Sequence, residues 1–199
     1  MSAHQERRVA PAAVIKVGGG ILLEADAIAK LGPLIARCAA RVPLLVIPGG
    51  GPFAETVREV DQRLQLPPDA AHWMAILAMD QFAEVLGAFI PEAEIVEELG
   101  EIEEALAQRR VPVLAPYRWL HAADELPHSW DVTSDSLAAY LTGLVGAERL
   151  LLVKPVEGTV PELTDPYFAR ALPAGTDCRC ATVATLASCA DWLTGERPA

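Results

Sequence analysis

Short apolar runs alternate with longer amphipathic segments along most of the chain. Runs of Val, Ile, Leu and Ala with almost no polar residue are typical of strands that a parallel sheet buries on both faces. They lie at 12–17, 43–48, 112–116 and 149–153, with shorter candidates at 93–97 and 178–183. Apolar residues at helical spacing predict helices at 24–40, 53–66, 69–90, 100–110, about 131–146 and 184–193. The alternation predicts an α/β fold in which helices cover both faces of a mostly parallel sheet.

Prolines and glycines mark the expected boundaries. Gly32–Pro33 should kink or split the first helix, and Pro67–Pro68 separates the second helix from the third. Residues 117–127 are expected to form a loop, and 161–175 should hold a short helix from Asp165. No internal repeat or low-complexity linker interrupts the pattern, so a single domain is expected.

Each of the first two apolar runs ends in three consecutive glycines, Gly18–Gly20 and Gly49–Gly51. Glycine lets the backbone turn sharply and approach a ligand closely, and a helix start after such a turn presents free N–H groups to an anion. Neither triplet matches the P-loop pattern, nor G-x-G-x-x-G in its usual setting. Flexible turns alone would explain one triplet, but two at strand ends favour an anion-binding site.

Two lysines close apolar runs, where an unpaired ammonium group would be costly. Lys16 lies just before the first glycine triplet. Lys154 directly follows the run at 149–153, and Gly158 comes shortly after it. Either lysine could simply reach solvent at the end of its strand. Their position beside glycine-containing turns favours contact with phosphate instead.

A helix start rich in Ser, Thr and Asp supplies two candidate carboxylates. Asp131 and Asp135 are four residues apart, so both would project from one face of the helix if it begins early enough. The alternative is an ordinary helix cap with a first-turn carboxylate that the helix dipole favours. Asp61, His72 and Trp73 are candidates for lining a substrate pocket, with packing or surface roles as the alternative.

Composition narrows the possible functions. The chain has 199 residues, 52% of them hydrophobic, which suits one domain with a sizeable core. Its formal net charge of −11 argues against nucleic acid or an anionic membrane as a partner. No apolar stretch approaches the roughly 20 residues of a membrane span, and no signal peptide opens the chain, so a cytoplasmic protein is expected. Cys178-Arg179-Cys180 lacks a second pair at ligand spacing, so no metal site is predicted.

In open parallel sheets a ligand lies beyond the carboxyl ends of the strands. The glycine triplets, the two lysines and the aspartates are therefore expected to share one crevice. Two lysines, two sets of N–H donors and two carboxylates suit phosphoryl transfer, which depends on positioning and neutralised charge more than on covalent work by the protein. The lysines would bridge the donor and acceptor phosphates, and the carboxylates would orient the lysines or help to hold a magnesium ion.

Most of the candidate chemistry lies in four segments, Val14–Gly20, Val46–Gly51, Asp131–Asp135 and Lys154–Gly158. They occur in the order found in the amino acid kinase superfamily, which the chain resembles over about residues 12–160. The superfamily includes acetylglutamate, aspartate, uridylate and isopentenyl phosphate kinases. The resemblance implies a three-layer αβα sandwich of the carbamate kinase-like type, ATP as donor, Mg²⁺, a small-molecule acceptor and a homo-oligomer. It divides the domain into a loose arm (1–11), an acceptor-binding half (12–148) and a shortened nucleotide-binding half (149–199).

The resemblance also implies roles for individual residues. Lys16 would stabilise the transferring phosphoryl group, Asp135 would organise the lysines, and Asp131 would contact the acceptor. Glycines would bind the two ligands, with Gly18, Gly19, Gly20 and Gly158 on the cofactor side and Gly49, Gly50 and Gly51 on the acceptor side. Lys154 is a departure, because much of the family has a threonine there, followed by an aspartate where this chain has Pro155. A lysine at this position would still meet the nucleotide phosphates.

Residues 71–76 and 127–135 resemble the small kinases of methanofuran biosynthesis, which convert [5-(aminomethyl)furan-3-yl]methyl phosphate to its diphosphate. That resemblance implies a phosphate monoester as acceptor, with Asp61 meeting its amine. The furan would stack on one of three aromatic side chains, Trp130, Trp73 or Tyr117. Two alternatives stay open. One is another branch of the superfamily, such as a uridylate or acetylglutamate kinase. The other is a non-catalytic protein on the same fold that stores molybdate or tungstate or binds a nucleotide.

Overall fold

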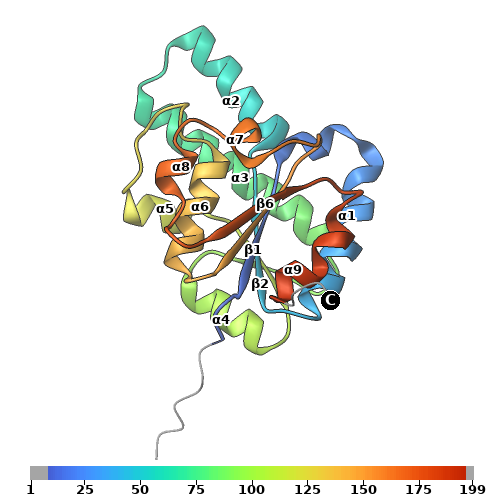
Figure 1. Ribbon diagram of the computed structural model, residues 1–199. Helices are drawn as coiled ribbons and strands as arrows, with labels where there is room; N and C mark the ends of the chain where they lie inside the picture. The colour runs from blue at the N-terminus through green and yellow to red at the C-terminus, as the bar shows by residue number, and fades with distance from the viewer. Residues whose placement is uncertain (1–8, 196–199) are drawn as a thin grey trace, which may run out of the picture.

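Six strands form one sheet, and every adjacent pair in it is parallel (Figure 1). The computed structural model describes residues 9–195. The strands are β1 (Ala13–Val17), β2 (Leu44–Pro48), β3 (Ala93–Val96), β4 (Val111–Leu114), β5 (Arg149–Val153) and β6 (Asp177–Ala181). They lie in the order β3–β4–β2–β1–β5–β6, with Lys16 of β1 opposite Ile47 of β2 and Leu152 of β5. The predicted parallel sheet is confirmed.

Helices connect the strands and lie on both sides of the sheet (Figure 1). The α-helices are α1 (Ala25–Ala39), α2 (Gly51–Leu64), α3 (Pro68–Phe89), α4 (Leu99–Ala107), α5 (Tyr117–Ala123), α6 (Ser134–Leu144), α7 (Val160–Leu163), α8 (Phe168–Ala171) and α9 (Ala190–Thr194). Two short 3-10 helices, η1 (Gly19–Leu23) and η2 (Leu186–Cys189), complete the described elements.

Two hydrophobic cores lie on opposite faces of the sheet, because successive strand residues point to opposite sides. Ile15 and Val17 of β1 belong to a core with α1, the second half of α3 and α9. Val14 belongs to the other core, with the first half of α3, α4, α6 and α8. Lys16 has the same parity as Val14, so it points toward the α6 layer. The two cores confirm the expected three-layer αβα sandwich.

Tertiary contacts overrule two predictions of helix extent. α1 is not split at Gly32–Pro33 but runs through both residues. Gly32 is required there, because a Cβ would lie 2.0 Å from the carbonyl oxygen of Phe89 at the end of α3. Residues 117–123 form α5 rather than a loop. The Tyr117 N–H at its start donates to the carboxylate of Asp80 on α3 at 3.1 Å, a partner that no local pattern reveals.

The helices in the last part of the chain are shorter than predicted. The helix expected at 184–193 is divided into η2 and α9, and the short helix expected from Asp165 is replaced by α7 and α8 on either side of that residue. Residues 1–8 of the predicted arm and the last four residues lie outside the described range. Across residues 9–195, no helix combines the length and apolarity that crossing a bilayer requires.

Candidate active site

The carboxyl ends of β2, β1 and β5 lie side by side, because these strands are neighbours in the sheet. The glycine triplets follow β1 and β2, and Lys154 follows β5. The two triplets touch each other: a Cβ on Gly19 would lie 2.1 Å from the backbone nitrogen of Gly51. Gly51 also has a φ of +57°, which favours glycine. The expected convergence of the two turns is therefore present in the fold.

The six glycines of the two triplets form two groups, one bonded into the sheet and one lining a cleft. The N–H groups of Gly18 and Gly49 donate to the carbonyl oxygens of Val153 and Val17, each at 2.8 Å, and so extend the sheet. Four glycines instead line the cleft described below, namely Gly19, Gly20, Gly50 and Gly51. The first N–H groups of a helix have no acceptor within that helix. The start of α2 therefore offers donors at the edge of this cleft.

Lys16 and Lys154 share the carboxylate of Asp135, the second residue of α6. The Lys16 Nζ lies 2.8 Å from Asp135 Oδ1, and the Lys154 Nζ lies 2.9 Å from Oδ1 and 2.7 Å from Oδ2. Lys154 also donates to the carbonyl oxygen of Leu163 at 2.7 Å. The three charged residues are buried, with 3%, 5% and 8% of their surface exposed for Lys16, Asp135 and Lys154. The fold thus brings together three residues that are far apart in the sequence.

Burial and the neighbouring charges together set the pKa values of Lys16 and Asp135. Burial lowers the pKa of Lys16, an effect that Lys154 adds to and that Asp135 offsets only in part. Burial would raise the pKa of Asp135, but the two neighbouring ammonium groups outweigh it and hold that pKa below its ordinary value. Asp135 is therefore ionised at neutral pH. With both lysines protonated, two positive charges face one carboxylate, an arrangement that attracts an anion.

A residue that the sequence analysis did not assign to the site, Asp165, caps the helix that carries Asp135. The N-cap residue of α6, Thr133, makes no cap bond with its own side chain. The Oδ2 of Asp165 instead accepts from the Thr133 N–H at 3.1 Å, the Thr133 hydroxyl at 2.7 Å and the Ser136 N–H at 3.1 Å. The Ser136 hydroxyl donates to Oδ1. No local signal reveals this cap, because it comes from about 30 residues further along the chain.

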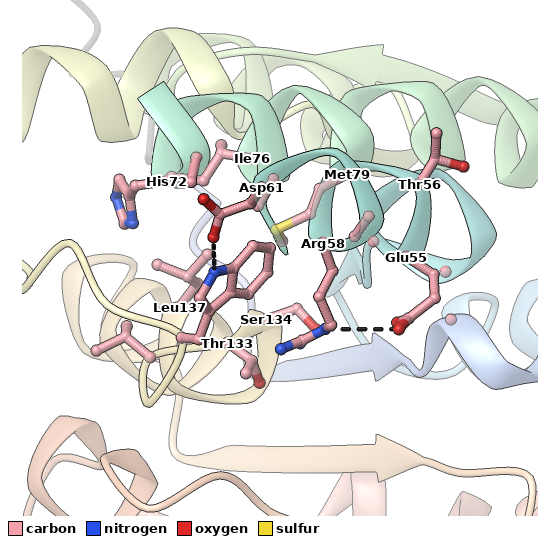
Figure 2. A pocket seen from close by; sticks show the side chains of 18 of the residues that line it. Glu55, Thr56, Arg58, Asp61, His72, Ile76, Met79, Thr133, Ser134 and Leu137 are labelled. Carbon is pink, nitrogen blue, oxygen red and sulfur yellow. Dashed lines mark hydrogen bonds and ion pairs between the residues drawn. The ribbon is translucent and has the colours of Figure 1, made fainter. Parts of the chain in front are cut away.

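A cleft of about 1050 Å³ opens between α2, α3 and residues 128–137. In Figure 2 side chains of α2 and α3 face the start of α6 across this space. Its apolar lining includes Ala71, Ala75, Ile76, Met79, Val132 and Leu137. A small set of polar side chains completes it, chiefly Glu55, Arg58, Glu59, Asp61 and His72. An apolar concave site with a few polar groups is typical of small-molecule binding.

Trp130 and two residues of α2 form one wall of the cleft. The Trp130 Nε1 donates to Asp61 Oδ2 at 2.7 Å, a bond drawn dashed in Figure 2. The guanidinium of Arg58 lies 4.1 Å from the Trp130 ring centroid and 3.6 Å from the Glu55 carboxylate. Asp61 Oδ1 accepts from the Leu66 N–H at 3.0 Å. Sequence analysis missed Arg58, because nothing distinguishes it from the other charged residues of this helix.

His72 lines the cleft and stacks on His128, with the ring centroids 4.1 Å apart and the planes 17° apart. The His128 ring nitrogens contact Asp69 at 2.6 Å and Asp124 at 2.8 Å. Burial would lower the pKa of His128, but these two carboxylates raise it. Burial, together with His128, lowers the pKa of His72 to about 4. His72 is therefore neutral at pH 7.

Trp73 is edge-on to both histidine rings and does not line the main cleft.

The buried cluster of Lys16, Asp135 and Lys154 is not part of the cleft lining, and neither are Gly18 and Gly49. Two other predicted site residues lie outside both the cleft lining and the cluster. Asp131 is exposed and precedes α6, which begins only at Ser134. The helix start expected at about residue 131 is therefore wrong, and the condition under which Asp131 and Asp135 would project from one helix face is not met. The helix starts late because the cap bonds from Asp165 are made at Thr133 rather than at an earlier residue. Gly158 is exposed in the loop after β5, where a Cβ would lie 2.9 Å from Leu163 Cγ.

Metal-ligating side chains are not grouped in the described part of the chain. Between residues 9 and 195, no three or more His, Cys, Asp or Glu side chains are arranged to hold a metal ion. Cys178 and Cys180 are free thiols, and burial raises the pKa of Cys178 to about 12. A metal site needs the thiolate form, which this environment disfavours.

The proteins of similar sequence or fold that are described next are kinases. The family model described as the amino acid kinase family matches residues 11–160. A curated relative, the [5-(aminomethyl)furan-3-yl]methyl phosphate kinase of Methanocaldococcus jannaschii, is 30% identical over 145 residues. The matched region makes up 73% of this chain and 66% of that protein, so the chain spans about two thirds of the relative's length.

Two solved structures share the fold at low sequence identity. The uridylate kinase of Archaeoglobus fulgidus has a TM-score of 0.70 and 18% identity, with 93% of this chain and 96% of that chain covered. The UMP kinase of Ureaplasma parvum has a TM-score of 0.65 and 14% identity, with 98% and 96% covered. At these identities the likeness concerns the fold alone. The family match covers most of the chain and includes both glycine turns, the helix with Asp135 and the end of β5, so this chain belongs to the amino acid kinase family.

Proposed function

We propose that the protein is an ATP-dependent kinase that phosphorylates a small phosphate-monoester acceptor. The observation that carries this proposal is the pairing of Lys16 with Asp135 beside two touching glycine turns. Phosphoryl transfer depends mainly on fixed positive charge and N–H donors around the transferring group. A buried, oriented lysine next to a helix start supplies both.

The two lysines have different roles in this proposal. Lys154 directs its three ammonium hydrogens to three acceptors, the two oxygens of Asp135 and the carbonyl of Leu163. Lys16 has a single acceptor among the described residues, Asp135 Oδ1. Two of its hydrogens therefore remain for phosphoryl oxygens. We expect Lys16 to contact the transferring group, while Asp135 and Lys154 hold it in position.

The glycine turns suit phosphate groups, the first turn (Gly18–Gly20) those of the nucleotide and the second (Gly49–Gly51) that of the acceptor. Gly19 packs so closely on Gly51 that backbone, rather than side chains, forms this edge of the cleft. N–H groups at the start of a helix are well suited to phosphate oxygens. Bound ATP would supply the phosphoryl group. Mg²⁺ would be held mainly by phosphate oxygens and water, as is usual at such sites.

The acceptor that we propose is [5-(aminomethyl)furan-3-yl]methyl phosphate, for which the M. jannaschii relative is named. Three groups of the cleft suit its chemistry. The Trp130 ring offers a stacking surface for a flat heterocycle, and Arg58 offers a positive charge for its phosphate. Asp61 already accepts two hydrogen bonds, but a carboxylate can accept about four, so it can also bind an amine.

The direct test is to incubate the purified protein with ATP, Mg²⁺ and this acceptor. We expect ADP and a diphosphate ester in equal amounts, followed by phosphorus NMR. UMP and acetylglutamate are the competing acceptors, and turnover of either in place of the furan would reassign the substrate. Bound molybdenum or tungsten in metal analysis, without ATP turnover, would overturn the kinase proposal in favour of storage.

A charge change in the cleft tests the acceptor site separately. Arg58→Met should raise the KM for the phosphorylated acceptor by about tenfold, because a charge-assisted bond to phosphate is lost. The matched control is Arg63→Met, an exposed arginine in the last turn of the same helix, outside the cleft lining. Equal KM values in the two variants would remove Arg58 from the acceptor site.

A further inference from the structure

We propose that Asp165 is a positioning residue for the cluster of Lys16, Asp135 and Lys154. It acts from a brace that we define as Leu163–Asp165, which runs from the last residue of α7 into the connection to α8. The inference rests on the kinase function proposed above and extends it to a residue that does not line the cleft.

The first argument is the set of hydrogen bonds that Asp165 accepts. Asp135 lies between Thr133 and Ser136, and the backbone N–H and hydroxyl of both these residues donate to the Asp165 carboxylate. The N–H of Tyr167 adds a fifth bond, at 3.1 Å to Oδ1. A carboxylate with five donors is held tightly. Because these donors flank Asp135 on both sides, Asp165 fixes the backbone from which Asp135 reaches the lysines.

The second argument is that the same brace also holds Lys154. The carbonyl oxygen of Leu163 accepts one of the Lys154 ammonium hydrogens at 2.7 Å. The other two are directed to Asp135. A segment of three residues therefore contacts both the helix that carries Asp135 and the lysine that shares its carboxylate. A shift of the brace would change the relative positions of Asp135 and Lys154, and with them the position of Lys16.

The third argument concerns charge. The charged groups that act on the buried Lys16 are Asp135 from α6, Lys154 from the end of β5 and Asp165 from the brace. Burial lowers the pKa of Lys16, and the negative charge of Asp165 works against that change. Asp165 thus adds a second negative charge near the cluster, while Asp135 remains the carboxylate that both ammonium groups contact. Loss of its charge should allow Lys16 to lose its proton at lower pH.

The chain offers a matched control three residues before Asp165. Glu162 also caps a helix start, accepting from the Thr159 N–H at 2.9 Å and the Thr159 hydroxyl at 2.7 Å. It is exposed and belongs to the capping box of α7. Asp165→Asn and Glu162→Gln therefore each remove one capping charge from the same segment. Only Asp165 is hydrogen-bonded to the start of α6, so only Asp165→Asn should disturb that helix.

NMR of ¹³Cε-labelled lysine tests the proposal without any activity assay. The chain contains three lysines, Lys16, Lys30 and Lys154, and the exposed side chain of Lys30 is an internal reference. We expect Asp165→Asn to lower the titration midpoint of Lys16 by about half a pH unit or more, since an opposite charge nearby favours the ammonium form. Glu162→Gln should leave all three midpoints unchanged. Unchanged midpoints in Asp165→Asn would overturn the proposal.

Kinetics with ATP and the furan phosphate give the second measurement. Asp165→Asn should lower kcat by about 10²-fold with little change in KM, because the misplaced groups act on the transferring phosphoryl group. Asp165→Glu, which keeps the charge, should restore part of kcat and the lysine midpoint. If Asp165→Asn does not fold, Thr133→Val, which removes one donor to Asp165, should still lower kcat. Wild-type kcat in Thr133→Val or in Asp165→Asn would contradict the positioning role. A wild-type protein without turnover would refute the proposed function alone, because the lysine titration would still decide the role of Asp165.

Discussion

The Lys16 Nζ lies 2.8 Å from Asp135 Oδ1, although the two residues are 119 positions apart in the chain. The contact joins the central strand of the sheet to the first turn of the helix above it. Both residues are buried, so Lys16 needs the charge of Asp135, while Asp135 is compensated by Lys16 and Lys154 together. The Lys16–Asp135 contact therefore matters both for the stability of the fold and for the proposed reaction.

Removing the Lys16 charge should abolish most of the activity. Lys16→Met keeps the apolar part of the side chain and should lower kcat by on the order of 10²–10³, because the main charge that faces the transferring group is lost. The exposed Lys30→Met is the control for the loss of a lysine elsewhere. Steady-state rates with ATP and the furan phosphate would measure both. A rate within threefold of wild type in Lys16→Met would place Lys16 outside the site.

Asp135→Asn should destabilise the protein more than Lys16→Met does. In Lys16→Met the Asp135 carboxylate still contacts Lys154 through both oxygens. In Asp135→Asn the two buried ammonium groups lose the one carboxylate that both contact, which should cost about 3 kcal/mol of the free energy of unfolding. Urea denaturation at pH 7 would compare the two variants. The opposite order of stability would show that Asp135 does not neutralise both lysines.

Gly19→Ala should separate the two glycine turns. The added Cβ would lie 2.1 Å from the nitrogen and 2.2 Å from the Cα of Gly51, so the backbone must move. We expect a large loss of ATP turnover and a lower melting temperature. Gly100→Ala in α4 is the control, because nothing lies within 4 Å of its Cβ and alanine favours a helix by about 0.5–1 kcal/mol. Comparable behaviour of the two variants would show that the turns do not touch.

Trp130→Phe should weaken the binding of the acceptor. The variant keeps an aromatic wall but loses the bond from Nε1 to Asp61, 2.7 Å long, so that Asp61 is no longer held in place. We expect the KM for the furan phosphate to rise by about five- to tenfold, by analogy with the loss of one hydrogen bond to a charged group, with kcat little changed. Trp192→Phe loses a similar bond, from Nε1 to Asp177 Oδ2 at 2.6 Å, outside the cleft. A similar KM change in both variants would argue against a role for Trp130.

Replacing Asp80 by asparagine should stabilise the protein in a pH-dependent way. Burial raises its pKa to about 6, so the folded state favours the protonated form. Asp80 therefore stabilises the protein below the unfolded pKa, near 3.8, and this contribution is lost as the pH rises through 6. Asp80→Asn should raise the free energy of unfolding by about 1–3 kcal/mol at pH 7.5, since an amide carries no charge.

The same change should bring no gain at pH 4, where Asp80 is protonated in the folded state. The amide oxygen can still accept from the Tyr117 N–H, which donates to Asp80 at 3.1 Å. Asp26→Asn, at an exposed position of α1, is the control and should change little at either pH. Chemical denaturation at both pH values would decide. A loss of stability at pH 7.5 would show that the carboxylate form is favoured at this position.

Local sequence was sufficient for the sheet and for the three charged residues of the cluster. Mostly apolar runs of five or six residues predicted strands buried on both faces, which holds for the four inner strands. The edge strands β3 and β6 are partly exposed instead. Lys16 and Lys154 stood out because an ammonium group at the end of such a run needs a partner. The glycine triplets stood out because glycine permits sharp turns and close approach of the backbone, and because each of two strands ended in such a triplet.

Contacts between distant segments decided the rest. The start of α6, and with it the separation of Asp131 from Asp135, depends on a cap from Asp165 about 30 residues away. Arg58 became a cleft residue only because α2 packs beside Trp130. Helix periodicity shows which face of a segment is apolar but not what lies opposite it. Hydrogen bonds and charge pairs across that space are set by tertiary packing, so the sequence could name the charged cluster but not the groups that hold it.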